Sequence, residues 1–136
     1  MLHDSRIIKR NVGIFLTLLC CSFISPLSAH HSAAMFDVEN EMKLDGTVTK
    51  FQFTNPHVWI HFTVTDENGE ETIWRVEALN PNSLKRKGWK RNSFQEGDKI
   101  TITFYPAKSG KPVGYFVRAI TADGTKLGQD LADRER

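Results

Sequence analysis

Residues 57–78 read HVWIHFTVTDENGEETIWRVEA and decide the fold, because they hold two strand-like runs on either side of a turn. In the first run, His57–Thr65, every second residue is apolar, which is the pattern of a β-strand with one buried face. The second run, Thr72–Ala78, is rich in β-branched and aromatic residues, which favour strands. The stretch therefore predicts an antiparallel hairpin.

The turn of this hairpin decides which side chains are buried, because a shift of one residue in register moves every side chain to the opposite face. A two-residue turn at Asn68-Gly69 would place Phe62 opposite Arg75 and would bury charge. A three-residue loop at 67–69, with a positive φ at its glycine, places Phe62 opposite Trp74 instead, and we expect this register. The buried pairs are then Phe62 with Trp74, Ile60 with Val76, and Val58 with Ala78.

The opposite face of the hairpin gathers polar and aromatic side chains, namely His57, Trp59, His61, Arg75 and Glu77. An indole ring among hydrogen-bonding groups can stack on a sugar ring or a base. This face is therefore a candidate ligand site. The alternatives are that Trp59 is an ordinary surface residue, or that the barrel or residues 30–36 cover it.

The remaining segments predict three further strands and one short helix. The strands span 42–53, 99–105 and 113–121. Gly46 inside the first of them indicates a bulge or a sharp coil. Asn80 is a good helix cap, Pro81 suits the first helical position and Gly88 suits the end, so we expect a helix of about two turns.

Three strands, a helix and two more strands form the order of an OB-fold, a small five-stranded Greek-key barrel. A small open sandwich is the alternative. We expect an all-β domain with one short helix at 42–127, an N-terminal segment at 30–41 and a flexible tail at 128–136. OB-folds commonly bind oligonucleotides or oligosaccharides on the face of strands two and three, which is the face that carries Trp59 here.

Residues 1–29 have the three regions of a cleavable signal peptide. Three basic residues precede the apolar run 12–24, and small residues up to Ala29 follow it. A run of 13 residues is shorter than the roughly 20 that span a bilayer as a helix. We expect cleavage after Ala29, with Ala34 as the alternative, and a periplasmic or secreted mature protein.

Cleavage after Ala29 would change the chemistry that is available to the chain. It removes both cysteines, Cys20 and Cys21, and leaves 15 basic and 15 acidic residues. Thiol nucleophiles and thiolate metal sites are then excluded, and a neutral domain makes nucleic acid an unlikely partner. The sequence has no phosphate loop, nucleophile elbow or paired-histidine motif, so we expect a binding protein and not an enzyme.

An amino-terminal His30 would be chemically distinct, because its α-amine and its ring nitrogen can chelate one metal ion together. Such a start resembles exported copper proteins that bind through an N-terminal histidine. His31 adds an imidazole, and His57 or His61 can supply a further one. Only one of His57 and His61 can bind the same ion as His30. Four residues along a strand span roughly 13 Å, which is too far for both rings to reach one ion. The alternatives are a flexible leader at 30–31 and ordinary surface histidines at 57 and 61. Copper or another divalent metal is the candidate ligand.

A cluster of basic residues surrounds Trp89 and comprises Lys85, Arg86, Lys87, Lys90 and Arg91. In an exported protein such a surface fits phospholipid headgroups or anionic glycans. A solvated helix end is the alternative interpretation. This cluster supports a third possibility, an envelope interaction protein without a small ligand.

Several spaced motifs together resemble a family of small exported bacterial proteins of unknown function. They include the His30-His31-Ser32 start, the Thr54-Asn55-Pro56-His57 motif with Trp59 following it, and Gly88-Trp89. The resemblance covers most of the mature chain and carries no established activity. It implies that His30, His31, Asn55, His57 and Trp59 are the first candidates for a functional role.

Overall fold

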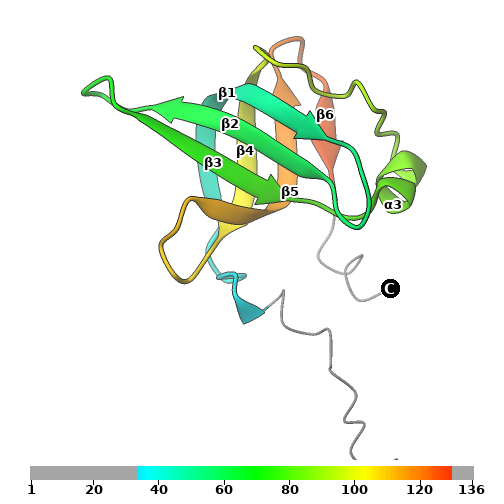
Figure 1. Ribbon diagram of the computed structural model, residues 1–136, viewed down its shortest axis with the longest axis horizontal. Helices are drawn as coiled ribbons and strands as arrows, with labels where there is room; N and C mark the ends of the chain where they lie inside the picture. The colour runs from blue at the N-terminus through cyan, green and yellow to red at the C-terminus, as the bar shows by residue number, and fades with distance from the viewer. Residues whose placement is uncertain (1–33, 130–136) are drawn as a thin grey trace, which may run out of the picture. The chain divides into compact units, whose positions relative to one another are not determined.

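A computed structural model describes residues 34–129 of the chain (Figure 1). This part contains β1 (Met42–Gln52), β2 (Trp59–Thr65), β3 (Glu71–Glu77), α3 (Pro81–Arg86), β4 (Lys99–Pro106), β5 (Val113–Thr121) and β6 (Lys126–Gly128). The predicted class, all-β with one short helix, is confirmed. Within residues 34–129 no helix is long and apolar enough to cross a membrane.

Five strands close into a barrel in the order β3-β2-β1-β4-β5, because β3 also pairs with β5, and the short β6 extends the sheet beyond β5. This closing pair is parallel and places Val76 opposite Gly114. The first three strands form a meander, and the helix follows them. The next two strands then return to the two edges of this meander, which is the Greek-key barrel of an OB-fold. The predicted five-stranded barrel is confirmed, and the open-sandwich alternative is wrong.

The hairpin of β2 and β3 has the predicted register. Phe62 lies opposite Trp74, and the amide of Asp66 donates to the carbonyl of Glu70 over 2.9 Å. Gly69 has a φ of 82°, so the three-residue loop with a glycine bulge is confirmed. The buried side chains on the inner face include Val58, Ile60, Phe62 and Val76, each with 0% of its surface exposed.

Gly46 allows β1 to approach β2 closely, but the bulge lies elsewhere. A Cβ atom at Gly46 would lie 2.7 Å from the ring of Phe62 and 2.8 Å from the carbonyl oxygen of Thr63. The irregularity in the pairing of β1 with β2 falls between Val48 and Lys50. The glycine therefore serves close packing, and the bulge that we expected at this position follows it along the strand.

The helix α3 begins and ends as its sequence predicts. The side chain of Asn80 accepts a hydrogen bond from the amide of Ser83, and Pro81 occupies the first turn. At the other end, Gly88 has a φ of 88° and the amide of Trp89 donates to the carbonyl of Leu84 over 3.0 Å. This is a Schellman cap, which turns the residue after the glycine back toward the helix.

The Schellman cap directs Trp89 into the core, where only 2% of its surface is exposed. Its ring packs edge-on against Phe94 and Phe116, with centroids 5.6 and 5.0 Å apart. The basic residues at 85–91 therefore surround a buried tryptophan. They form a charged helix end and the turn that follows it.

The C-terminal end of the described part is tied into the barrel by Gln129. Its side chain is buried, accepts a hydrogen bond from the amide of Leu79 over 2.9 Å and donates to the carbonyl of Phe116 over 2.8 Å. The short strand β6 pairs with β5 just before it. Gly128 and Gln129 therefore belong to the barrel and not to the tail predicted at 128–136. Residues 130–136 lie outside the described part.

The N-terminal segment joins the barrel at Phe36, which is 1% exposed. Phe36 forms a β-bridge with Ala107, and its ring lies 5.8 Å from that of Tyr115. Part of the segment predicted at 30–41 therefore covers β5. The predicted signal peptide at 1–29 and the candidate ligands His30 and His31 lie outside the described residues.

Candidate functional site

The predicted polar and aromatic side chains come together on the outside of β1, β2 and β3, which lie side by side in Figure 1. We call this surface the outer face; it comprises Lys50, Gln52, His57, Trp59, His61, Arg75 and Glu77. Two cross-strand rows make up most of it. The first row is Gln52–Trp59–Glu77, and the second row is Lys50–His61–Arg75.

The first row places a half-buried Trp59 between an amide and a carboxylate. Glu77 is only 7% exposed, and its Oε1 contacts Nδ1 of His57, which lies two residues before Trp59 in the chain. This contact fixes the His57 ring from one side. Its other nitrogen, Nε2, has no partner within residues 34–129.

The second row places a partly buried His61 between two cations. Its Nε2 lies 2.8 Å from Oε1 of Gln52, so a neutral ring with a proton on Nε2 donates to this oxygen. Burial lowers the pKa of His61, and the positive charges of Lys50 and Arg75 lower it further. The imidazole is therefore neutral at pH 7, and its Nε2 is occupied by a hydrogen bond.

The loop between β1 and β2 carries Asn55, which the family resemblance singled out. Asn55 is exposed and precedes Pro56 through a cis peptide bond. Within residues 34–129 no hydrogen bond joins its side chain to the outer face. The structure thus assembles His57, Trp59, His61, Arg75 and Glu77 as predicted, and it leaves Asn55 on the neighbouring loop.

Sequence reasoning missed Lys50 and Gln52, the two members of the outer face that β1 contributes. The bulge after Val48 shifts the phase of the strand, so that Phe51 continues the inner face. The signal was present in the sequence as an apolar spacing of three, from Val48 to Phe51, in a strand that otherwise alternates with a spacing of two.

The loop between β4 and β5 borders the outer face beside β3. The amide of Arg75 donates to the carbonyl of Pro112 in this loop over 3.1 Å. Lys108 and Lys111 are exposed on the same loop. Next to it, Phe36 and Tyr115 form a small aromatic cluster on the outside of β5. The outer face is therefore bounded on its β3 side by a basic loop.

The described residues alone do not form a metal centre. Within residues 34–129, no three histidine, cysteine or acidic side chains are grouped so that they could hold one ion. The described residues include two predicted metal ligands, and because Nε2 of the alternative ligand His61 already contacts Gln52, the remaining candidate is His57. Its pairing with Glu77 is nevertheless relevant, because a carboxylate on one ring nitrogen is the usual support of a metal-binding histidine.

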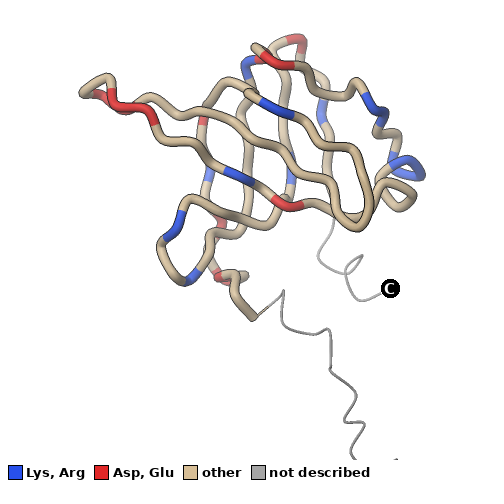
Figure 2. Tube along the Cα trace, viewed as in Figure 1, with Lys and Arg blue, Asp and Glu red and all other residues tan. Residues whose placement is uncertain are grey.

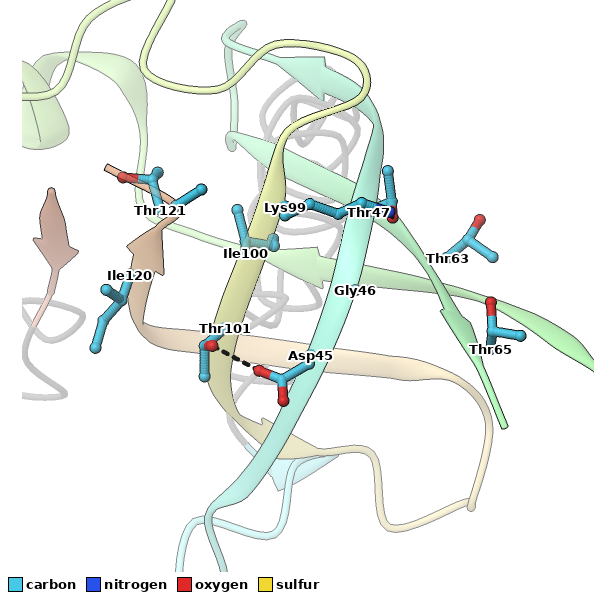
Figure 3. A pocket seen from close by; sticks show the side chains of 11 residues that line it. Asp45, Gly46, Thr47, Thr63, Thr65, Lys99, Ile100, Thr101, Ile120 and Thr121 are labelled. Carbon is cyan, nitrogen blue, oxygen red and sulfur yellow. Dashed lines mark hydrogen bonds between the residues drawn. The ribbon is translucent and has the colours of Figure 1, made fainter. Parts of the chain in front are cut away.

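A hollow of about 430 Å³ lies on the outside of the barrel around β1 and β4 (Figure 3). It is lined by threonines, and both of its charged side chains have polar partners. Asp45 accepts a hydrogen bond from Thr101 over 2.5 Å, and Lys99 donates to Thr47 over 2.6 Å. None of the predicted site residues lines this hollow.

Comparisons with known proteins found several similar solved structures and one matching family. A mitochondrial single-stranded DNA-binding protein of S. cerevisiae, Rim1, is 11% identical, with 67% of this chain and 98% of that chain covered and a TM-score of 0.47. A second crystal form of Rim1 is 8% identical, with coverages of 61% and 93% and the same TM-score.

A small single-stranded DNA-binding protein of Streptomyces coelicolor is 16% identical, with coverages of 69% and 94% and a TM-score of 0.37. No curated protein matches the sequence. A family model matches residues 17–116, which include the whole outer face. The chain therefore belongs to the family of unknown function DUF6152.

Proposed function

We propose that the protein is an exported binding module, periplasmic or secreted, whose outer face holds a small ligand with a ring, foremost a sugar. The observation that carries this proposal is the position of Trp59. Its indole is half-buried between Gln52 and Glu77, on the face where OB-folds commonly bind oligosaccharides and oligonucleotides. Export rests on the predicted signal peptide at 1–29.

The polar groups around Trp59 suit a sugar because most of them are already held in place. Glu77 is fixed by His57, and Gln52 by His61. An indole covers the apolar face of a sugar ring, and fixed hydrogen-bonding groups at its edges can meet the hydroxyls without first losing side-chain freedom. The outer face therefore combines a stacking surface with oriented donors and acceptors.

Loss of the indole should remove most of this binding. We expect Trp59→Ala to weaken the binding of envelope sugars about fivefold to 150-fold, because stacking on one aromatic ring contributes about 1–3 kcal/mol. Binding is measured by calorimetry on the mature protein, with thermal unfolding as the check that the variant folds.

The matched control for this experiment is Ile73→Ala. Ile73 is 60% exposed and lies on β3 opposite Thr63, beyond the two rows. The Ile73→Ala variant should bind envelope sugars with the same dissociation constant as the unaltered protein. Equal binding by the Trp59→Ala variant and the unaltered protein would count against a ligand site at Trp59.

A second candidate function, metal binding, is favoured by the contact between Nδ1 of His57 and the carboxylate of Glu77. The pair leaves Nε2 of His57 available, and cleavage after Ala29 would supply an amine and an imidazole from His30, with His31 next to it. Imidazole and amine nitrogens suit Cu(II), and a carboxylate behind a histidine raises its basicity as a ligand. We propose copper as the first metal to test.

The amino terminus itself provides the test of metal binding. Protein that begins at His30 with a free amine should bind Cu(II) at least about a hundredfold more tightly than the same protein acetylated at that amine, because acetylation removes the chelating nitrogen. The intact mass of the exported protein establishes where cleavage occurs. Equal affinity of the two forms, or a mature chain that begins at Met35, would refute the proposed chelate.

A further inference from the structure

The second row of the outer face carries two positive charges without a compensating acid. Lys50 and Arg75 are both exposed and lie on either side of His61, two strand spacings or roughly 10 Å apart. Within residues 34–129 neither forms an ion pair, whereas Arg118 is paired with Glu41 over 2.7 Å. This part of the outer face therefore has a net positive charge.

The loop between β4 and β5 extends this positive surface beyond β3. Its two charged residues, Lys108 and Lys111, are basic and exposed, and the hydrogen bond from Arg75 to Pro112 holds the loop against the strand. Figure 2 shows the basic positions on β1, β3 and this loop, with the acidic residues of the β2–β3 turn at the far end of the hairpin.

Glu77 is the acidic residue that lies closest to Lys50 and Arg75 in the strand pairing, but its carboxylate is already engaged. It is nearly buried in the first row and is engaged by His57. The two cations also act on His61 between them, since their charges contribute to the lowering of its pKa.

We propose that the ligand of the outer face is an anionic sugar, whose ring stacks on Trp59 and whose carboxylate or phosphate lies between Lys50 and Arg75. The inference rests on the proposed function and specifies its ligand. The two rows are two residues apart along each strand, about 6.6 Å, which suits a sugar ring and the anionic group attached to it. The anion comes from a free sugar acid or sugar phosphate, or from an anionic glycan chain.

The experiment compares sugars that differ in charge. Calorimetry on the mature protein uses glucuronate, glucose 6-phosphate, glucose, inorganic phosphate and a short oligomer of a sugar acid. We expect glucuronate and glucose 6-phosphate to bind at least about tenfold more tightly than glucose or inorganic phosphate, with weaker binding at higher salt. Tighter binding of the oligomer assigns the ligand to a glycan chain, and equal binding assigns it to the free sugar.

Two charge variants and a control locate the anion. Lys50→Gln and Arg75→Gln should each weaken glucuronate binding about threefold to tenfold and leave glucose binding unchanged. Lys43→Gln is the matched control, because Lys43 is exposed on the same strand but pairs with Thr103 of β4, away from the outer face. It should have no effect.

His61 reports on the bound anion directly. A negative charge between Lys50 and Arg75 offsets the two cations, so glucuronate should raise the pKa of His61 in an NMR titration. By linkage, binding becomes tighter as pH falls from 8 toward 5.5, where glucuronate stays ionised. The other titratable groups of the outer face are the His57–Glu77 pair in the first row, and for this reason the ring signals of His61 are followed individually.

The outcomes separate this inference from the proposed function. If glucose and glucuronate bind equally and both depend on Trp59, the anionic ligand is refuted and the sugar site remains. If inorganic phosphate binds as tightly as glucose 6-phosphate, the sugar component is refuted. If none of the sugars binds to the outer face, the proposed function and the inference fail together.

Discussion

Replacing Trp89 with alanine should lower the free energy of unfolding by about 3–5 kcal/mol, which is the usual cost of deleting a large aromatic side chain from a core. The ring is 2% exposed and packs edge-on against Phe94 and Phe116. Its Nε1 also donates to the carbonyl of Gly128 over 3.4 Å. The deletion would leave a cavity between the end of α3 and β5, because the surrounding strands cannot move in to fill it.

The measurement is urea unfolding of the mature protein, followed by circular dichroism. Trp59→Ala is the control, because it removes the same side chain from a half-buried position on the outer face, and we expect it to cost only about 1 kcal/mol. Similar losses in the two variants would show that Trp89 does not anchor α3 to the barrel.

These two tryptophans show what the sequence can and cannot predict. Trp59 alternates with buried residues along a strand, so its outward direction follows from the period of two. Trp89 stands among lysines and arginines, and local composition suggests a surface. Its burial follows from the left-handed Gly88 and the cap on Leu84, which reverse the direction of the chain at a single residue.

The fold was predictable where neighbouring residues determine it. Alternation and the glycine at 69 were sufficient for the hairpin register, and the order of the elements was sufficient for the barrel. Contacts between distant segments were not predictable. Gln129 reaches the amide of Leu79, 50 residues away, and nothing in its polar surroundings in the sequence signals a buried amide.

The candidate site was likewise predictable only where neighbouring residues determine it. His57, Trp59, His61, Arg75 and Glu77 were expected together because they share one face of one hairpin. The contribution of β1 depends on a bulge that changes which residues face outward, and the basic loop depends on the pairing of β3 with β5. The positive charge of the outer face therefore became apparent only when three segments of the chain were brought together.

The pairing of β3 with β5 closes the barrel, and Gly114→Ala should disrupt it. A Cβ atom at Gly114 would overlap the ring of Phe104, which is fully buried. The ring has no room to turn away, because Trp74 and Phe62 pack against it with centroids 5.1 and 6.3 Å away. We expect the added methyl group to lower the free energy of unfolding by about 2–3 kcal/mol, since overfilling a packed core forces the backbone to shift.

Gly128→Ala provides the matched control for this prediction, because its Cβ would lie 3.6 Å from the nearest atom, an ordinary contact. It should leave the unfolding midpoint unchanged. A smaller side chain at position 104 tests whether overlap with the Phe104 ring causes the loss of stability. The double variant Phe104→Leu with Gly114→Ala should lose less free energy of unfolding than the sum of the losses in the two single variants. Strict additivity of the two would mean that the ring of Phe104 is not what Gly114 accommodates, and that the glycine serves the β3–β5 backbone pairing alone.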